Sequence, residues 1–281
     1  RRITPADGVL YAIRDVTATV PSVPLITASI ISKKSAEGVG NLVLDIKVGS
    51  AAFMQQVEEA RELAHSMIEV GKGLGMQVRV LLTQMDLPIG THIGNSHEVI
   101  EILDILDGTG SWDSISLVAI QGAHLLQMSG MVETIEQGQI RLLETLSNGA
   151  AATHFRRMCA AQGVSQHILN DLSSHLDIAP YSFTLHSAMD GWVENIDALE
   201  LSKVLCELGA GRVSAEDDVD HGVGAVINSE IGKQVEAGDL ILSVHHREEE
   251  LSEQHMQRLE SCISISDTPV SIQDRLLEVI E

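Results

Sequence analysis

The sequence predicts an α/β protein, with a mostly parallel sheet flanked by helices and a β-rich α+β module after it. Residues 42–48 and 77–83 have the composition of strands, and a helical pattern at 55–72 separates them. This βαβ unit favours a parallel sheet covered by helices. Residues 114–120 predict a third strand. From about residue 180 the pattern changes to short strands separated by glycine turns.

The remaining elements follow from local signals. A helix is predicted from Pro24 to just before Gly38, because proline is favoured in the first turn and glycine just past the end. Asn95 is predicted to cap a helix that ends near Asp107, with Glu98 in the capping-box position. Further helices are predicted at 121–128, 130–147, 149–161, 164–174, 197–208 and 248–263. Strands of the β-rich module are predicted at 183–185, 191–194, 222–227 and 239–245.

Composition limits the kinds of partner. The 281 residues are 44% hydrophobic, which is ample for a core, but only 2% aromatic, so the core must be aliphatic. A net charge of −22 argues against nucleic acid or an anionic membrane as a partner. A local phosphate site is still compatible with this charge, since such sites use backbone dipoles and a few cations.

The cysteines and apolar runs indicate a compartment. Cys159, Cys206 and Cys262 are widely spaced and odd in number, which is typical of reduced thiols and gives no zinc pattern. Charges interrupt every long apolar stretch before the ~18 residues of a membrane span. We therefore expect a cytoplasmic protein.

Ser29 and Lys33 are the first candidate site residues. They are four positions apart on the predicted helix, so they share one face, with Ile26 about one turn earlier. A hydroxyl and an ammonium suit a flat heterocycle that carries an N–H and carbonyl oxygens. The alternative is that Ser29 bonds its own helix and Lys33 is solvated, and local chemistry alone favours it.

Arg14 lies beside Asp15, among apolar and β-branched residues. A buried arginine needs a partner, which is either a structural ion pair with Asp15 or a ligand carbonyl that receives the guanidinium fork. The residues alone leave both interpretations open.

Two further groups of residues contain potential ligands for an ion. The loop from Ile89 to His92, with Glu101 nearby, offers backbone carbonyls and one carboxylate, which suit a hard cation. An ordinary turn with a solvated helix glutamate is the alternative that the local residues favour. His245 and His246 are predicted to lie at the surface, since no converging set of metal ligands accompanies them.

Residues 10–34, LYAIRDVTATVPSVPLITASIISKK, resemble the base-binding signature of the thymidine phosphorylase / pyrimidine nucleoside phosphorylase family. Residues 44–54 and 82–99 are similar to the family's DVKxGxGAF and LTDMxxPLG…GNALEV segments, and 205–212 and 231–239 look like its C-terminal module. The chain is identified as a member because these likenesses run in order along nearly its whole length.

This resemblance implies a small helical lobe, a large α/β lobe and a β-rich module, which we place at 1–37, 38–180 and 181–281. It implies reversible phosphorolysis of thymidine to thymine and 2-deoxyribose 1-phosphate in pyrimidine nucleoside salvage. Phosphate is the co-substrate, no cofactor is required, and the full-length protein is expected to be a homodimer. A broader pyrimidine nucleoside phosphorylase and a non-catalytic short form that binds pyrimidines are the alternatives.

The resemblance also implies roles for residues. Arg14 and Lys33 would donate to the two carbonyls of the pyrimidine ring, and Ser29 would meet its N–H region. The apolar walls of the site would be Ile26, Val20 and Phe53. Some bacterial relatives hold a potassium ion, and the matching groups are the Ile89 and His92 carbonyls and the Glu101 carboxylate.

Some features depart from the family pattern. In the family about a third of the polypeptide, including the phosphate-binding segment, precedes the base-binding motif. We therefore expect this chain to be the C-terminal two-thirds and to lack normal catalysis alone. Ala51 replaces a usual glycine and Gln84 a common aspartate, and neither is a proposed base contact. The related anthranilate phosphoribosyltransferase type is disfavoured by the Arg14, Ser29 and Lys33 pattern.

Overall fold

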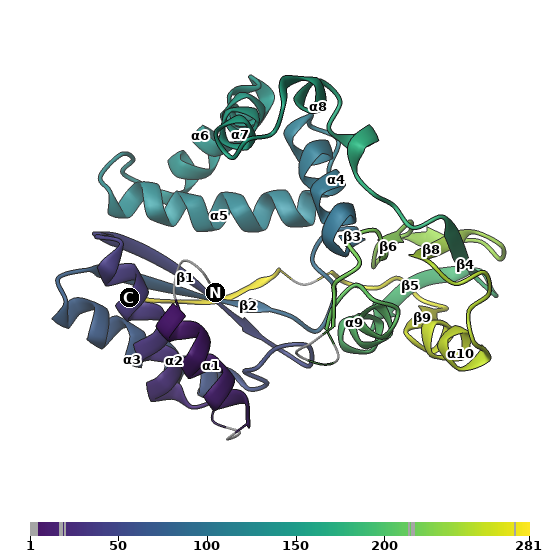
Figure 1. Ribbon diagram of the computed structural model, residues 1–281, viewed down its shortest axis with the longest axis horizontal. Helices are drawn as coiled ribbons and strands as arrows, with labels where there is room; N and C mark the ends of the chain where they lie inside the picture. The colour runs from purple at the N-terminus through teal and green to yellow at the C-terminus, as the bar shows by residue number, and fades with distance from the viewer. Residues whose placement is uncertain (1–4, 17–18, 20, 213, 215–216, 273) are drawn as a thin grey trace. The chain divides into compact units, whose positions relative to one another are not determined.

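The computed structural model describes residues 5–16, 19, 21–212, 214, 217–272 and 274–281 (Figure 1). The chain divides into two compact units. Unit 1 comprises residues 1–85, 120–139 and 275–281, and unit 2 comprises residues 86–119 and 140–274. Each unit is described separately below.

Unit 1 begins with α1 (Pro5–Val16) and α2 (Val23–Ala36) and continues into the βαβ segment β1 (Asn41–Val48), α3 (Val57–Gly73) and β2 (Gln77–Gln84) (Figure 1). Strands β1 and β2 pair in parallel along their whole length. The predicted α/β class and the predicted βαβ unit are therefore confirmed.

A strand that the sequence pattern did not predict completes this sheet. Strand β10 (Leu276–Ile280) pairs antiparallel with β2, which gives the order β1-β2-β10. The sheet thus contains one parallel and one antiparallel pair. Short segments such as β10 give a weak periodic signal, since only a few residues can show the alternation.

The core of unit 1 lies between this sheet and α3. Alternate residues of a strand point to one face, and Ile46, Val80 and Leu82 on that face are almost fully buried. Leu63 and Met67 of α3 join them, in agreement with the apolar spacing of residues 55–72. Burial of this apolar surface is the main term that stabilises the unit.

The predicted strand at 114–120 is wrong, because these residues form part of α5 (Trp112–Met128). The alternation of apolar and polar residues over 114–117 suggested a strand, but the apolar positions continue at helical spacing to Met128. The helix predicted at 121–128 is thus the second half of α5. Ser111 marks the true start, since its hydroxyl accepts a hydrogen bond from the Asp113 backbone N–H at 3.3 Å.

The sheet face opposite α3 carries several polar side chains beside the fully buried Leu81, and within unit 1 it meets the second half of α5. The Asp45 carboxylate accepts hydrogen bonds from Thr83 Oγ1 at 2.5 Å, Lys47 Nζ at 2.6 Å and Gln121 Nε2 at 2.5 Å. Because these donors come from β1, β2 and α5, one carboxylate joins three elements.

Arg79 makes a second set of polar contacts on the same face of the sheet. Its Nη1 lies 2.9 Å from His124 Nδ1 and 2.8 Å from Gln127 Oε1, and its Nη2 lies 2.6 Å from Glu281. His124 is buried, and burial together with the Arg79 charge lowers the pKa of its imidazole. The lowered pKa favours the neutral imidazole, whose unprotonated nitrogen can accept from the guanidinium.

The helices that follow agree broadly with prediction. They are α4 (Asn95–Leu106), α6 (Ile135–Ser147), α7 (Ala150–Ala161), α8 (Gln166–Asn170) and the short 3₁₀ turn Ser173–His175. The predicted cap of α4 is wrong by one residue, because Gly94 is the N-cap and Asn95 already lies in the helix. Glu98 lies one position beyond that of a capping box, but its Oε1 still accepts from the N-cap Gly94 N–H at 3.2 Å.

The β-rich part of unit 2 contains two antiparallel sheets among the described residues. One has the order β3-β6-β8-β4 and the other β7-β5-β9. The strands of the first are β3 (His92–Ile93), β6 (Gly224–Ile227), β8 (Leu240–His246) and β4 (Tyr181–His186). Those of the second are β7 (Gln234–Val235), β5 (Gly191–Ile196) and β9 (Ile263–Ser266). The predicted strands of this module are confirmed, whereas β7 and β9 were not predicted as separate strands.

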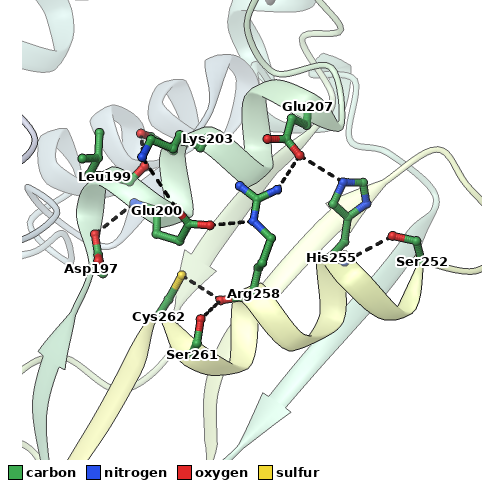
Figure 2. Close-up of polar contacts among 11 residues, drawn as sticks. Asp197, Leu199, Glu200, Lys203, Glu207, Ser252, His255, Arg258, Ser261 and Cys262 are labelled. Atoms are coloured by element: carbon green, nitrogen blue, oxygen red, sulfur yellow. Dashed lines mark hydrogen bonds and ion pairs between the residues drawn. The ribbon is translucent and has the colours of Figure 1, made fainter.

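Two helices, α9 (Ala198–Glu207) and α10 (Glu253–Ser261), complete this part of unit 2. Figure 2 shows Arg258 of α10 reaching to α9, where Nε lies 2.5 Å from Glu200 Oε1 and Nη1 lies 2.5 Å from Glu207 Oε2. His255 Nε2 lies 3.3 Å from the same oxygen of Glu207. The Arg258 hydrogen bond, more than any other contact, lowers the pKa of Glu207. Arginine with two carboxylates therefore ties the two helices together.

The prediction that His245 and His246 lie at the surface is wrong. His246 is buried and stacks on Tyr181, and His245 Nδ1 lies 2.9 Å from Nε2 of the buried His97. Burial, helped by neighbouring histidines, lowers the pKa of His97 to about 4. Successive strand residues point to opposite faces, so β8 directs one imidazole to each side, with His246 buried and His245 half-buried.

The three cysteines are unpaired, as expected for reduced thiols. Cys262 is buried, and burial raises the pKa of its thiol to about 12. Among the described residues, no helix combines the length and apolar character that crossing a membrane requires.

Candidate functional site

Helix α2 carries two of the candidate site residues and has the predicted boundaries. Its N-cap is Ser22, Pro24 lies in the first turn, and Gly38 follows the helix with a φ of +74°. Proline has no N–H to satisfy at this end, and glycine adopts the left-handed conformation at little cost, so the sequence itself sets the length of the helix.

Ser29 and Lys33 lie together on one face of α2. Lys33 Nζ donates a hydrogen bond to Ser29 Oγ at 3.2 Å, and both side chains are half-buried. The predicted common face is therefore confirmed. The pair forms a cationic donor set, since the ammonium has three protons and the hydroxyl can donate or accept.

Arg14 lies at the junction of α1 and α2. Its Nη1 donates to the Leu25 carbonyl at 3.4 Å and its Nη2 to the Thr19 carbonyl at 3.5 Å, while the Thr19 N–H donates to the Arg14 carbonyl at 3.0 Å. The structure thus holds this guanidinium against the first turn of α2. The alternative partner Asp15 has a side chain outside the described residues.

The three proposed wall residues differ in their surroundings. Ile26 is half-buried and packs against the core of unit 1, so part of its surface belongs to the core. Phe53 lies in the turn after β1, with 74% of its surface exposed. Val20 lies outside the described residues. The role of all three as walls stays a proposal.

The candidate cation site lies in unit 2, and its carboxylate is buried. Glu101 is 6% exposed, so the alternative of a solvated helix glutamate is wrong. Oε1 of Glu101 accepts from the Thr91 N–H at 2.8 Å, from Thr91 Oγ1 at 3.4 Å and from Ser114 Oγ at 3.4 Å. All three of these hydrogen bonds end on the same carboxylate oxygen, Oε1.

The loop that precedes β3 wraps closely around this carboxylate. Gly90 has a φ of +69°, and a Cβ there would collide with the Glu101 carboxylate, so any other residue would be strained and would displace that carboxylate. The Thr91 carbonyl accepts from the Ile227 N–H at 2.7 Å. Since hydrogen-bonded and non-hydrogen-bonded pairs alternate in an antiparallel ladder, the next carbonyl, of His92, faces away from β6. The carboxylate and the outward carbonyl are both oxygen donors, the ligand type that hard cations prefer.

Sequence reasoning missed Ser114 and Asp113 in this site. Asp113 Oδ2 accepts the Gly90 N–H at 3.0 Å, so both residues hold the loop and its carboxylate. They were missed because residues 114–120 were assigned to a strand. The Ser111 cap followed by an acidic residue was the signal that would have placed them in the first turn of a helix.

No group of three or more His, Cys, Asp or Glu side chains in the described parts of the chain is arranged to hold a metal ion. The candidate cation site therefore depends on backbone carbonyls together with Glu101.

Comparison with known proteins defines the class. A model of a glycosyl transferase family, described as its a/b domain, matches residues 1–152, which is more than half of the chain. A model described as the pyrimidine nucleoside phosphorylase C-terminal domain matches residues 192–266. The chain therefore contains the a/b domain of the glycosyl transferase family, followed by a C-terminal domain of the pyrimidine nucleoside phosphorylase type.

Two relatives narrow this class. The chain is 38% identical to a pyrimidine-nucleoside phosphorylase of Staphylococcus aureus (strain USA300), over 96% of its own length and 62% of that protein. It is 44% identical to a thymidine phosphorylase of Rattus norvegicus, over 95% of its own length and 58% of that protein. The chain belongs to the thymidine phosphorylase / pyrimidine nucleoside phosphorylase family, and it spans about three fifths of the length of these relatives.

Proposed function

We propose that the protein to which this chain belongs is a thymidine phosphorylase. It would convert thymidine and phosphate reversibly into thymine and 2-deoxyribose 1-phosphate, in the salvage and breakdown of pyrimidine nucleosides. Support comes from the family, from the names of the two relatives, and from the donor set on α1 and α2. The observation that carries the proposal is the contact of Lys33 with Ser29 on a helix whose first turn holds Arg14.

The donor set suits the charge change of this reaction. A phosphate oxygen forms a bond to C1′ of the sugar, and the bond between C1′ and N1 of the base breaks. The electron pair of that bond moves to N1 and spreads onto the two carbonyl oxygens of the ring. Lys33 and Arg14 would donate to these oxygens, and the Ser29 hydroxyl would accept from the ring N–H that lies between them. Donors fixed where charge develops lower the barrier, with losses of about 10²–10³ in kcat typical for one donor.

The test is thymine release from thymidine, with and without phosphate, by the protein expressed from its whole gene. We expect phosphate-dependent release in the native protein and a loss of about 10²-fold or more in Lys33→Ala. Lys34→Ala is the matched control, because Lys34 lies on the same helix but pairs with Glu37 at 2.9 Å. Equal activity of the two variants would contradict the assignment of Lys33, and no phosphate-dependent release would contradict the function.

Two alternatives have distinct outcomes. Comparable kcat/KM values for thymidine, 2′-deoxyuridine and uridine would favour a broad pyrimidine nucleoside phosphorylase. Binding of thymine without any turnover would favour a non-catalytic protein that binds pyrimidines. The name of the bacterial relative favours the first alternative over the second.

We also propose that the Ile89 and His92 carbonyls, with Glu101, hold a potassium ion. The ion would hold the loop that precedes β3, and no other cofactor is invoked. Addition of K⁺ or Rb⁺, but not Na⁺, should raise the melting temperature of the protein, and Glu101→Gln should abolish that difference. An equal response to Na⁺ and K⁺ would exclude a selective site.

The protein is further proposed to be a cytoplasmic homodimer that acts on a pyrimidine nucleoside and phosphate. Its three unpaired cysteines support a reducing compartment. Analytical ultracentrifugation of the whole protein tests the dimer, and a monomer at micromolar concentration would exclude it. Cell fractionation tests the compartment.

A further inference from the structure

We propose that Thr27 and Ser66 are positioning residues for the pyrimidine site, because their hydroxyl pair fixes the rotation of α2 on α3. The inference rests on the proposed function of Ser29 and Lys33. Thr27 Oγ1 lies 2.9 Å from Ser66 Oγ, and Thr27 is only 2% exposed. Neither residue is itself expected to touch the substrate.

Helix geometry connects the hydroxyl pair to the site. Thr27 and Ile31 are four residues apart and form the buried side of α2. Ser29 and Lys33 each follow two residues later, so they lie about 200° further around the axis. Whatever fixes the direction of Thr27 therefore fixes the direction of the site residues.

Apolar packing alone would fix this rotation poorly. Apolar side chains surround much of α2: Ile31 is fully buried, Ile26 and Ile30 are half-buried, and Leu25 is 40% exposed. A rotation of about 100°, one residue along the helix, would replace one isoleucine with another in the core. The free energy of apolar burial depends on the area buried and not on a particular alignment of groups. It would therefore change little between these two orientations of α2.

The hydrogen bond between Thr27 and Ser66 favours one orientation of α2 over the others. A hydrogen bond requires short distance and alignment, and a buried hydroxyl without a partner destabilises the fold. Thr27 Oγ1 points to α3, although a helical threonine commonly bonds the carbonyl one turn earlier in its own helix. In the native orientation of α2 the two hydroxyls are hydrogen-bonded to each other. In a rotated orientation the Thr27 hydroxyl would face apolar side chains.

Helix α3 is a suitable reference for this alignment. Ser66 lies between Ala64 and Met67, which are buried in the core against the sheet. The position of α3 is thus set by the sheet, and the hydroxyl pair transmits it to α2. The site residues are held by a chain of contacts from β1 and β2 through α3.

The experiment uses the whole protein, four single variants and one double variant. Thr27→Val keeps the shape of the side chain and removes the hydroxyl, Ser66→Ala removes the other hydroxyl, and Thr27→Ser keeps the bond. Ser35→Ala is the matched control, because it removes an exposed hydroxyl from the same helix. Thymine affinity by calorimetry, kcat and KM with thymidine, and the melting temperature are measured for each.

We expect Thr27→Val and Ser66→Ala to raise the Kd for thymine about threefold to tenfold, and to lower kcat as well. Thr27→Ser and Ser35→Ala should bind like the native protein. The double variant Thr27→Val with Ser66→Ala should show no further loss, since the bond is already broken in each single variant.

The outcomes separate this inference from the proposed function. Lower melting temperatures with unchanged thymine Kd would overturn the positioning role and leave the proposed function intact. Failure of the native protein to bind thymine would overturn the proposed function, and the inference with it. If Thr27→Val does not fold, Ser66→Ala, at a half-buried position, decides the question.

Discussion

On one face of β1 and β2 the contacts with α3 are apolar, and on the other face hydrogen bonds to α5 lie beside the buried Leu81. Leu82 and Ile46 point toward α3, whereas Asp45, Thr83 and Arg79 meet Gln121, His124 and Gln127. The same two strands thus attach one helix by burial and another by hydrogen bonds. The two attachments should respond differently to substitution and to pH.

The difference follows from the physics of each contact. Apolar burial is non-directional and cumulative, so it stabilises the unit but tolerates small shifts. A satisfied hydrogen bond contributes little net free energy, but an unsatisfied buried partner costs more than the bond contributes. The apolar face therefore supplies stability, and the polar face specifies which part of α5 lies over which residue.

Leu82→Ala should give the largest effect. Leu82 is fully buried on the apolar face, so truncation removes transfer free energy and leaves a cavity. We expect the free energy of unfolding to fall by about 2–5 kcal/mol, measured by urea denaturation. Leu74→Ala is the control, because Leu74 is 53% exposed and should change stability by only about 0.5 kcal/mol. Equal effects of the two variants would contradict the conclusion that burial on the apolar face stabilises the unit.

Asp45→Asn should give an intermediate effect on the polar face. It leaves the Lys47 ammonium without its anion and disturbs two further donors. We expect a loss of about 1–3 kcal/mol in the same assay, since the Asp45 side chain is only 21% exposed. Adding Lys47→Met to Asp45→Asn should recover part of that loss, because the unpaired charge is then gone. A larger loss in the double variant would show that the unpaired Lys47 charge is not a cause of the loss.

The smallest effect should be the response of the polar face to acid. The folded-state pKa of His124 lies below the 6.5 of an unperturbed histidine, so folding favours the neutral imidazole. Its contribution to stability is complete above about pH 6.5 and is lost as the pH falls through the lower folded pKa. The pKa values of His97 and His245 are also lowered, so these residues contribute to the loss of stability in acid in the same direction. The test therefore compares the pH dependence of a His124 variant with that of the native protein. His124→Gln should have a shallower fall in urea midpoint below pH 6.5 than the native protein, and identical slopes would count against it.

The same contrast explains what the sequence predicted. Apolar periodicity predicts elements that bury one face, so the βαβ unit and α2 were placed correctly from residues such as Leu63, Met67 and Pro24. The pairing of Ser29 with Lys33 was predictable because it depends only on helix spacing. The structure also agrees with the predicted strands of the β-rich module.

Contacts between distant polar residues could not be predicted in this way. Nothing local in the sequence relates Thr27 to Ser66 or Asp45 to Gln121, and such pairs carry no periodic signal. The burial of Glu101 depends on a loop and a helix start that meet only in three dimensions. His246 was expected at the surface for the same reason, because its stacking partner Tyr181 comes from another strand.

Strand β10 imposes an order of events during synthesis. The β2 residue Gln84 and Arg275, which leads into β10, hydrogen-bond to each other although 191 positions separate them in the chain. At the usual rates of translation, about 5–20 residues per second, β2 emerges roughly 10–40 seconds before its neighbour. During that interval one edge of β2 is open, and unit 2, which occupies most of the intervening chain, has time to fold first. A nascent chain halted before residue 275 should therefore carry a protease-resistant unit 2 and a protease-sensitive β2.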